Sequence, residues 1–383
     1  MNRYLVLVLL VIFLFCLTGC WNYKEISDFY IVAGVAIDKD NETGEFIVTT
    51  ELINIKDNQL SPGYESIKVE SKGNGIYEAI ITMTRTSAKR LIWSHATTLI
   101  ISQEVAKDGI APLLDWFIRD IEPRLNIDVF ISGEETAKEL LGNESLPTDI
   151  RSFEFDIMIN KNQDHVRVPV LKIYELINEL YLPKNHAVLP IIRSVSNSGR
   201  VTNTLTGGAI FTSDRLVGFL NQEDIIQYTL IKNMANKGFI KVNLEEGYTN
   251  SFVILEIFNQ KTKIKPSYAK DNISFDIKVI ADVAIAELDT KTDYISKSGR
   301  ELLKIKSEEY VATQIESTIN KVQKQFGFDI FGFGNIIRHR DPHFWKEIEK
   351  DWDLLFSESD FNINCQLNIR SSGHFSKPIE VNK

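Results

Sequence analysis

A cysteine at position 20 follows the apolar segment with which the chain begins. Arg3 precedes an apolar run over residues 4–17, and small residues then lead to the thiol in the sequence Leu17-Thr18-Gly19-Cys20. A basic residue, an apolar run of this length and small residues before a cleavage point are typical of a secretory leader. A thiol at the first position after cleavage can carry a diacylglycerol as a thioether. The sequence therefore predicts a leader over residues 1–19 and lipid attachment at Cys20, with a plain N-terminal membrane anchor as the alternative.

The residues after this cysteine offer no long tether. Residues 21–27 contain no Gly/Ser-rich spacer, and an apolar strand candidate begins near Tyr30. One acyl chain binds a bilayer only marginally, at about 0.8 kcal/mol per buried methylene, so the two chains of a diacylglycerol give stable anchoring. We expect the folded body to lie close to an outer membrane face.

The histidine and glycine motifs elsewhere in the chain do not complete a known zinc-binding or phosphate-binding motif. His339 and His343 have the four-residue spacing of zinc ligands on a helix, but Pro342 interrupts the helix between them and no third ligand follows. Gly332-Phe333-Gly334 lacks the third glycine and the Lys-Ser/Thr of a phosphate-binding loop. We predict neither metal nor nucleotide binding here.

Acidic pairs and an aromatic cluster have structural explanations. The series Asp38-x-Asp40-x-Glu42 lacks the later glycine and glutamate of a calcium loop, and a hairpin turn ending at Gly44 explains it better. Glu134 and Glu135 are expected on different faces of a helix and cannot act as a pair. Trp93-Ser94-His95 precedes a strand, where a structural role is the favoured interpretation. The residues therefore predict no enzyme and no cofactor.

Composition and charge describe an ordinary acidic globular chain. The 383 residues are 44% hydrophobic and 25% charged, with a formal net charge of −9. Removal of residues 1–19 leaves 383 − 19 = 364 residues and, with the loss of Arg3, a charge of −9 − 1 = −10. No clustered Lys/Arg face is evident in the sequence, which argues against nucleic acid and anionic lipid as electrostatic partners.

Cysteine usage excludes a disulfide framework in the mature chain. Cys16 lies in the leader and Cys20 would carry lipid, so Cys365 has no partner. Cys365 falls on the apolar side of an alternating segment over residues 361–369. We predict a buried thiol in a strand.

Periodicity predicts mixed α and β structure throughout. Strands are expected at 30–37, 45–55, 66–71, 97–102 and 127–132. One helix is expected to have an apolar face formed by residues 76, 80, 83 and 87. Further helical segments are expected within 103–120 and at 134–141. Residues 142–206 are interrupted by four prolines. A hairpin over 205–220 then leads to a helix capped by Asn221.

The last third has the clearest pattern. Residues 273–285 alternate as one long strand, and residues 311–326 follow a helical period. A second helix from His343 to Phe356, with Phe344, Ile348, Trp352 and Leu355 on its apolar face, precedes the Cys365 strand. The expected fold is α+β, a mixed α/β ectodomain of sheets covered by helices. Its expected parts are an N-terminal domain at 20–200, including a Pro-broken transition from about 142, a middle domain at 201–265 and a C-terminal domain at 266–383.

Several short motifs occur together in a specific order after the leader. The segments Gly19-Cys20-Trp21-Asn22-Tyr23-Lys24-Glu25-Ile26 and Val32-Ala33-Gly34-Val35-Ala36-Ile37-Asp38-Lys39 come first. Downstream stand Arg90-Leu91-Ile92-Trp93-Ser94-His95, the segments 205–211 and 215–220, Asp329-Ile330-Phe331-Gly332-Phe333-Gly334, and Pro342, Trp345 and Trp352. With the lipobox, this series resembles the Ger(x)C family of spore germination lipoproteins over essentially the whole mature chain. The match departs at Trp93-Ser94, where the resemblance would place a small aromatic residue and a glycine.

The resemblance implies a role and partners that the residues alone do not give. It implies the C subunit of a nutrient germinant receptor, with three mixed α/β domains and no known enzymatic activity. The protein would be lipid-anchored to the outer face of the inner spore membrane, the cell membrane of the sporulating bacterium, with an A and a B membrane subunit as partners. It leaves open which nutrient is sensed and whether this subunit contacts it.

Two other classes of protein would share parts of this sequence pattern. A solute-binding lipoprotein of an importer would share the leader, but it normally adds a tether and two doubly wound lobes. A surface hydrolase would need a nucleophile, a base and an orienting group, which these residues do not assemble.

Overall fold

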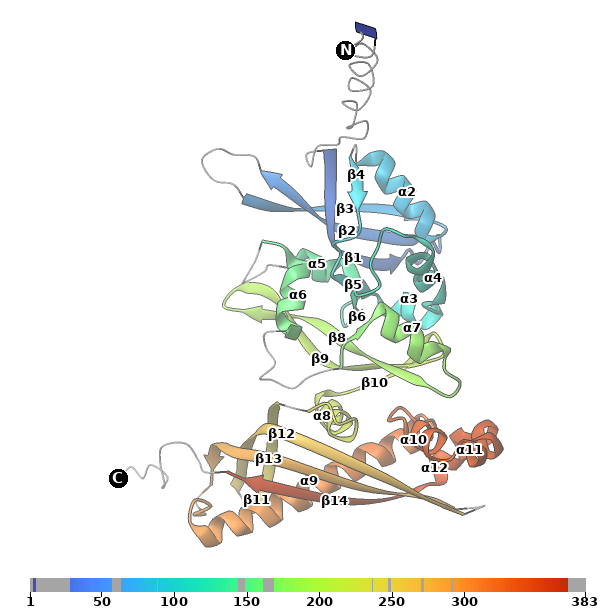
Figure 1. Cartoon of the computed structure of the whole chain (residues 1–383). Helices are drawn as coiled ribbons and strands as arrows, with labels where there is room; N and C mark the ends of the chain where they lie inside the picture. The colour runs from blue at the N-terminus through green and yellow to red at the C-terminus, as the bar shows by residue number, and fades with distance from the viewer. Residues whose placement is uncertain are drawn as a thin grey trace, which may run out of the picture.

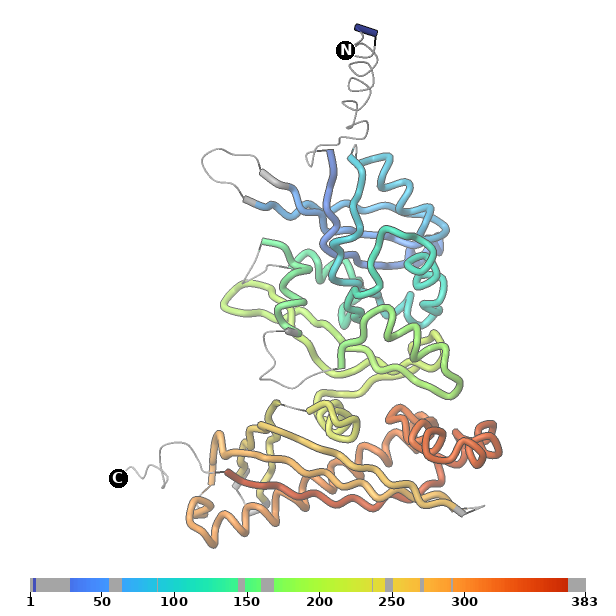
Figure 2. The backbone as a smooth tube through the Cα atoms, viewed as in Figure 1, coloured from blue at the N-terminus to red at the C-terminus, as the bar shows by residue number. Residues whose placement is uncertain are grey.

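The chain folds around two sheets with helices packed on them, and the two sheets lie one beyond the other (Figures 1 and 2). The computed structural model describes residues 3–4, 28–56, 63–87, 89–143, 149–160, 169–235, 237–246, 249–269, 272–290 and 292–370. The α+β fold class predicted from the sequence is confirmed.

The first sheet has ten strands and mixes parallel and antiparallel pairing. Its order is β10-β9-β8-β6-β5-β1-β2-β3, with β4 beside β1 and β7 beside β6. In the centre of the sheet, β1 is parallel to β5, β5 to β6 and β6 to β8. On either side, β1-β2-β3 and β8-β9-β10 form antiparallel meanders. The strands are β1 (Phe29–Lys39), β2 (Phe46–Lys56), β3 (Gly63–Gly73), β4 (Arg90–Ile92), β5 (Thr98–Ile101), β6 (Asp128–Ser132), β7 (Leu171–Lys172), β8 (His186–Asn197), β9 (Arg200–Thr212) and β10 (Arg215–Leu220).

Helices cover both faces of the first sheet. One face packs against α2 (Ile76–Thr86), α3 (Gln103–Asp108), α4 (Ala111–Arg119) and α7 (Ile173–Tyr181). The other face packs against α5 (Ala137–Gly142) and α6 (Arg151–Asn160). Seven consecutive residues of β1 are therefore buried, as expected for a central strand that is covered on both sides.

Among the described residues, helices cover one face of the second sheet only. Its strands run in the order β11-β12-β13-β14. Alternate residues of β13, from Ile273 to Val283, are buried against the helices, and the residues between them are more exposed. The elements are β11 (Gly238–Glu246), β12 (Thr249–Ala269), β13 (Asn272–Asp289), β14 (Asp360–Ile369), α8 (Gln222–Ile231), α9 (Lys297–Gln325), α10 (Phe333–Arg340), α11 (Pro342–Ile348), the 3-10 helix η2 (Glu349–Asp351) and α12 (Trp352–Glu358).

Two predicted helices differ from the observed ones. The helix expected from His343 to Phe356 is divided into α11 and α12 by the 3-10 turn η2. The tighter turn changes the helical phase, so the buried residues are Trp345, Ile348, Trp352 and Phe356, while Phe344 and Leu355 are only partly buried. The helix expected at 134–141 begins instead at Ala137, because the carboxylate of Asp38 accepts from the amides of Ala137 (2.6 Å) and Lys138 (3.0 Å).

The two predicted domain limits differ in their position relative to the observed strands. The limit after residue 200 lies at the start of β9, next to the turn that joins it to β8. The limit after residue 265 lies inside β12, which pairs with β13 along most of its length. The two sheets themselves meet at the segment that runs from β10 through α8 to β11 (Figure 1). The domain limits remain a prediction.

Candidate functional site

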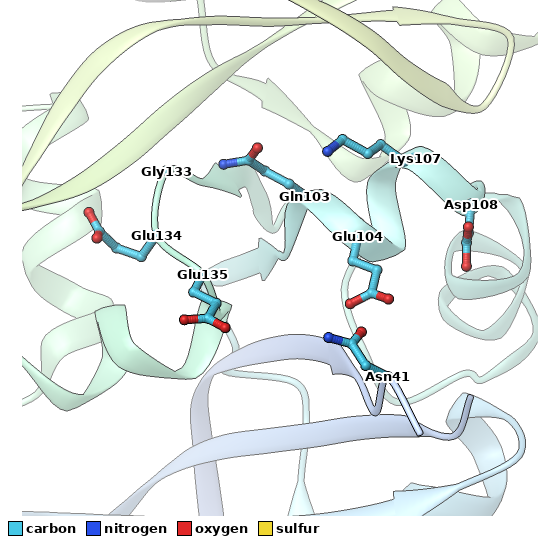
Figure 3. Close-up of a pocket in the computed structure, with 8 residues that line it drawn as sticks. All are labelled: Asn41, Gln103, Glu104, Lys107, Asp108, Gly133, Glu134 and Glu135. Carbon is cyan, nitrogen blue, oxygen red and sulfur yellow. The ribbon is translucent and has the colours of Figure 1, made fainter. Parts of the chain in front are cut away.

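A polar hollow of about 670 Å³ lies at the carboxyl ends of three parallel strands of the first sheet. β1 ends just before Asn41, β5 leads into Gln103 and Glu104, and β6 leads into Glu134 and Glu135 (Figure 3). The carboxyl edge of parallel strands is where open α/β sheets bind ligands. This hollow is therefore a candidate for a ligand-binding or catalytic site.

The side chains around the hollow mainly hold the surrounding loops together. Glu134 Oε1 accepts from the amide of Ser194 at 2.8 Å, and Gln103 Nε2 donates to the carbonyl of Ser132 at 3.0 Å. Figure 3 shows the carboxylates of Glu134 and Glu135 pointing apart, but both residues lie in the loop before α5 and not on the helix that the sequence predicted. The residues that line this hollow include no histidine, cysteine or serine that could act as a nucleophile or base with them.

The histidine and glycine motifs of the last third have structural roles. His339 is exposed and its Nδ1 lies 2.7 Å from the carbonyl oxygen of Asn335. Asp341 separates α10 from α11, as the proline in the sequence predicts, and no group of three metal-ligating side chains occurs in the described ranges. The amides of Phe331, Gly332 and Gly334 donate to the buried carboxylate of Asp329 at 2.8–2.9 Å. These amides are therefore not available to a phosphate.

Asp38 and Asp40 of the acidic series have two different structural roles. Asp40 accepts from the amides of Glu42 (3.0 Å) and Thr43 (3.1 Å) in a turn in which Gly44 has a φ of 74°. This confirms the predicted hairpin turn, and a hydrogen bond from Lys72 lowers the pKa of Asp40 to about 2. Asp38 instead is buried and caps α5, although burial raises its pKa. Only the turn was expected from the sequence.

Trp93 and Cys365 are both buried, as was predicted for Cys365. The Trp93 ring meets that of Trp116 edge-on, with 5.0 Å between centroids, whereas His95 is exposed. Cys365 is 8% exposed, and burial raises the pKa of its thiol to about 12, so it is not a nucleophile at neutral pH. Cys20, the predicted lipid attachment site, lies outside the described residues.

The structure corrects the expectation that basic residues do not cluster. Three alternate residues of β12, Lys261, Lys263 and Lys265, and Lys278 of β13 are exposed on the uncovered face of the second sheet. The alternating sequence Lys-Thr-Lys-Ile-Lys was a local signal for part of this group. Only the pairing of β12 with β13 adds the fourth lysine. We call these four residues the lysine row.

Residues at the start of β8 connect the two sheets. Lys184 Nζ lies 2.5 Å from a carboxylate oxygen of Asp353, and the ring of His186 stacks on Phe328 with 4.2 Å between centroids. Neither ring nitrogen of His186 has a hydrogen-bond partner among the described residues. Burial lowers the pKa of His186 to about 4. The contact between the two sheets thus contains a neutral histidine.

Acid should weaken the folded state through this histidine. Because its folded pKa lies below the ordinary value of 6.5, its stabilising contribution is complete above pH 6.5 and is lost as the pH falls toward 4. We expect a loss of about 2 kcal/mol in the free energy of unfolding between pH 7 and pH 5 from this residue. The His186→Phe variant, measured by urea unfolding at both pH values, should lack that part of the loss. The exposed control His343→Gln should retain it, and an unchanged pH dependence in His186→Phe would contradict the assignment.

Comparison with known proteins gives the family of this fold. The model of the spore germination protein N-terminal domain matches residues 22–194, and the model described as spore germination B3/GerAC like, C-terminal, matches residues 206–373. The two matches follow one another along the chain, and the second begins within β9, so it includes the last part of the first sheet as well as the whole second sheet. The chain belongs to the Ger(x)C family of spore germination proteins.

Relatives match over nearly the whole length. Spore germination proteins YndF, B3 and KC of Bacillus subtilis (strain 168) are 23%, 24% and 24% identical to the chain, and the alignments cover 96%, 95% and 99% of it and 96%, 96% and 98% of those proteins. The crystal structure of the GerBC protein has a TM-score of 0.55 and 19% identity, with 91% of this chain and 99% of that one covered. It shows the same fold. None of these descriptions names an enzymatic activity.

Proposed function

We propose that this chain is the membrane-anchored C subunit of a spore nutrient germinant receptor and is needed for germination in response to small nutrients. The observation that carries the proposal is the ordered match of two spore germination domains over residues 22–194 and 206–373. Membrane subunits of the A and B type would be its partners, at the outer face of the inner spore membrane.

The geometry at the N-terminal end supports anchoring through lipid. Eight peptide links separate Cys20 from Asp28, and a chain of that length spans at most about 28 Å. β1 starts at the end of the molecule that lies nearest the N-terminus in Figure 1. Within the described ranges, no helix combines the length and the apolar character needed to cross a bilayer. A lipid at Cys20 would hold the first sheet beside the membrane.

The side-chain chemistry supports assembly rather than catalysis as the role. The polar hollow and the sequence motifs described above use their acids and histidines to cap helices and fix turns. A subunit that acts through partners is stabilised by them, because ligands that bind only the folded state shift the folding equilibrium. We therefore expect mutual dependence of the abundance of the three subunits.

Loss of this chain should remove the response to one nutrient. A clean deletion should abolish germination with that nutrient, leave sporulation and nutrient-independent germination intact, and lower the amounts of the A and B subunits in the spore membrane. Germination assays and quantitative immunoblots measure these effects. Normal nutrient germination in a strain that lacks this chain and every paralogue would refute the proposal.

The anchor itself is tested by exchanging single cysteines. Cys20→Ala should abolish the incorporation of labelled lipid and remove the protein from the membrane fraction, because the thioether can no longer form. Cys365→Ala, which changes a buried thiol, is the matched control and should retain the label. Lipid label on Cys20→Ala protein would show that the attachment site is elsewhere.

A further inference from the structure

The lysine row concentrates positive charge on an acidic protein. Lys261, Lys263 and Lys265 alternate along β12, so their side chains leave the same face of the sheet about 6.6 Å apart. The intervening Thr262 faces the other side, where its hydroxyl donates to the carbonyl of Leu230 at 2.6 Å. The chain as a whole carries a net charge of −9. The row is therefore a local feature and not a consequence of a basic composition.

Strand register places like charges directly opposite one another. Lys263 pairs with Lys278, and Lys261 pairs with the uncharged Ile280. Like charges at directly opposed positions destabilise an antiparallel pair. Among the described residues, none of the four lysines takes part in a salt bridge. The pairing of Lys263 with Lys278 therefore does not stabilise the fold.

Two carboxylates on the same face offset part of the charge of the row. Asp276 lies opposite Lys265, and its carboxylate also accepts from Asn362 Nδ2 at 2.9 Å. Asp282 accepts from Asn368 and from Arg370. The neighbouring strand β14 presents uncharged amides on the same face, namely those of Asn362, Asn364, Gln366 and Asn368. With four lysines against these two carboxylates, the row keeps a surplus of positive charge beside a band of hydrogen-bonding groups.

We propose that the lysine row and the amides of β14 bind an acidic segment of a partner protein. An extended segment with Asp or Glu at alternate positions repeats its carboxylates at the spacing of Lys261, Lys263 and Lys265. The amides of β14 can hydrogen-bond its backbone or side chains. Single exposed ion pairs contribute little, so binding depends on several pairs forming together and weakens with salt.

A protein segment fits this surface better than other anions. Nucleic acid is less well matched, because the four lysines and the amides of β14 provide no aromatic ring for base stacking. A bilayer is a poor candidate because the second sheet lies at the end of the molecule away from the N-terminus (Figure 1). The exclusion of a bilayer rests on the proposed anchor at Cys20, whereas the rest of the inference concerns a surface of the purified chain and does not depend on the proposed function.

The test uses the full chain in a non-ionic detergent and a fluorescent ten-residue polyglutamate peptide. We expect binding at low salt that is lost at high salt, and at least tenfold weaker binding by the double variant Lys263→Glu, Lys278→Glu. The double variant Lys346→Glu, Lys350→Glu changes two exposed lysines on α11 and η2 by the same charge. It should bind within twofold of the original chain.

A single exchange separates binding from folding. Lys263→Glu turns the like-charge pair with Lys278 into an attractive one, so we expect its melting temperature to rise by about 1–3 °C while peptide binding falls. Equal loss of binding in the Lys346, Lys350 control would overturn the proposal. The proposal would also be overturned if the chain did not bind polyglutamate but bound phosphatidylglycerol vesicles, or associated with itself, in a way that Lys263→Glu changes.

Discussion

The Glu51→Ala substitution should lower the free energy of unfolding by about 3 kcal/mol. Glu51 lies in the middle of β2 and is 1% exposed. Its carboxylate accepts from the amides of Arg151 (2.8 Å) and Ser152 (2.7 Å) and from the hydroxyls of Ser152 (2.6 Å) and Ser66 (2.7 Å). An alanine would leave these donors without their acceptor, and a buried unsatisfied group costs about 1–3 kcal/mol.

This carboxylate also determines how α6 sits on the sheet. The amides of Arg151 and Ser152 belong to the first turn of α6, where a negative charge stabilises the helix. Ser152 lies so close to β1 that a Cβ on Gly34 would fall 2.1 Å from its hydroxyl oxygen. The loss of Glu51 should therefore release α6 as well as weaken the sheet.

Two matched variants make the Glu51 prediction specific. Glu51→Gln keeps one acceptor oxygen without the charge and should cost less than Glu51→Ala. Glu70→Ala removes an exposed glutamate of β3, paired with Lys138 at 3.1 Å, and should cost under about 1 kcal/mol. Urea unfolding followed by circular dichroism measures all three. Equal effects of Glu51→Ala and Glu70→Ala would show that the buried network does not support the fold.

The Trp352→Ala substitution should cost about 3–5 kcal/mol, as for other large aromatic side chains removed from a core. Trp352 is fully buried between the second sheet and its helices. Its ring lies edge-on to Trp345, with 5.5 Å between centroids, and packs near Phe356. Gly334 leaves room for this pair, because a Cβ there would fall 2.7 Å from the indole nitrogen of Trp352.

The control for this prediction comes from the same helix. Leu354→Ala removes a side chain that is 61% exposed on α12 and should change the free energy of unfolding by less than about 0.5 kcal/mol. Calorimetry of both variants compares the transition that contains the second sheet. A Trp352→Ala protein as stable as Leu354→Ala would mean that the aromatic cluster does not hold the second sheet and its helices together.

The Trp352 cluster could be predicted in part from the sequence, whereas the Glu51 network could not. The motif around Gly334, with Trp345 and Trp352, carries the family resemblance, and its structural meaning is an aromatic cluster held by the Asp329 cap. Glu51 appears in the sequence only as a charged residue within an apolar strand. Its partners Arg151 and Ser152 lie about 100 residues away, on a helix in the segment that prolines had made difficult to interpret.

Local pattern alone determined the alternating strand β13, the second half of α9, the Asn221 cap of α8 and the buried position of Cys365. Each depends on side chains a few positions apart, whose spacing follows from strand or helix geometry. Only the tertiary structure decided that Asp38 and Glu51 cap distant helices, that His186 lies between the two sheets and that Lys263 faces Lys278. The physical reason is that strand order and register bring together residues far apart in the chain, and no short-range periodicity records which residues will meet.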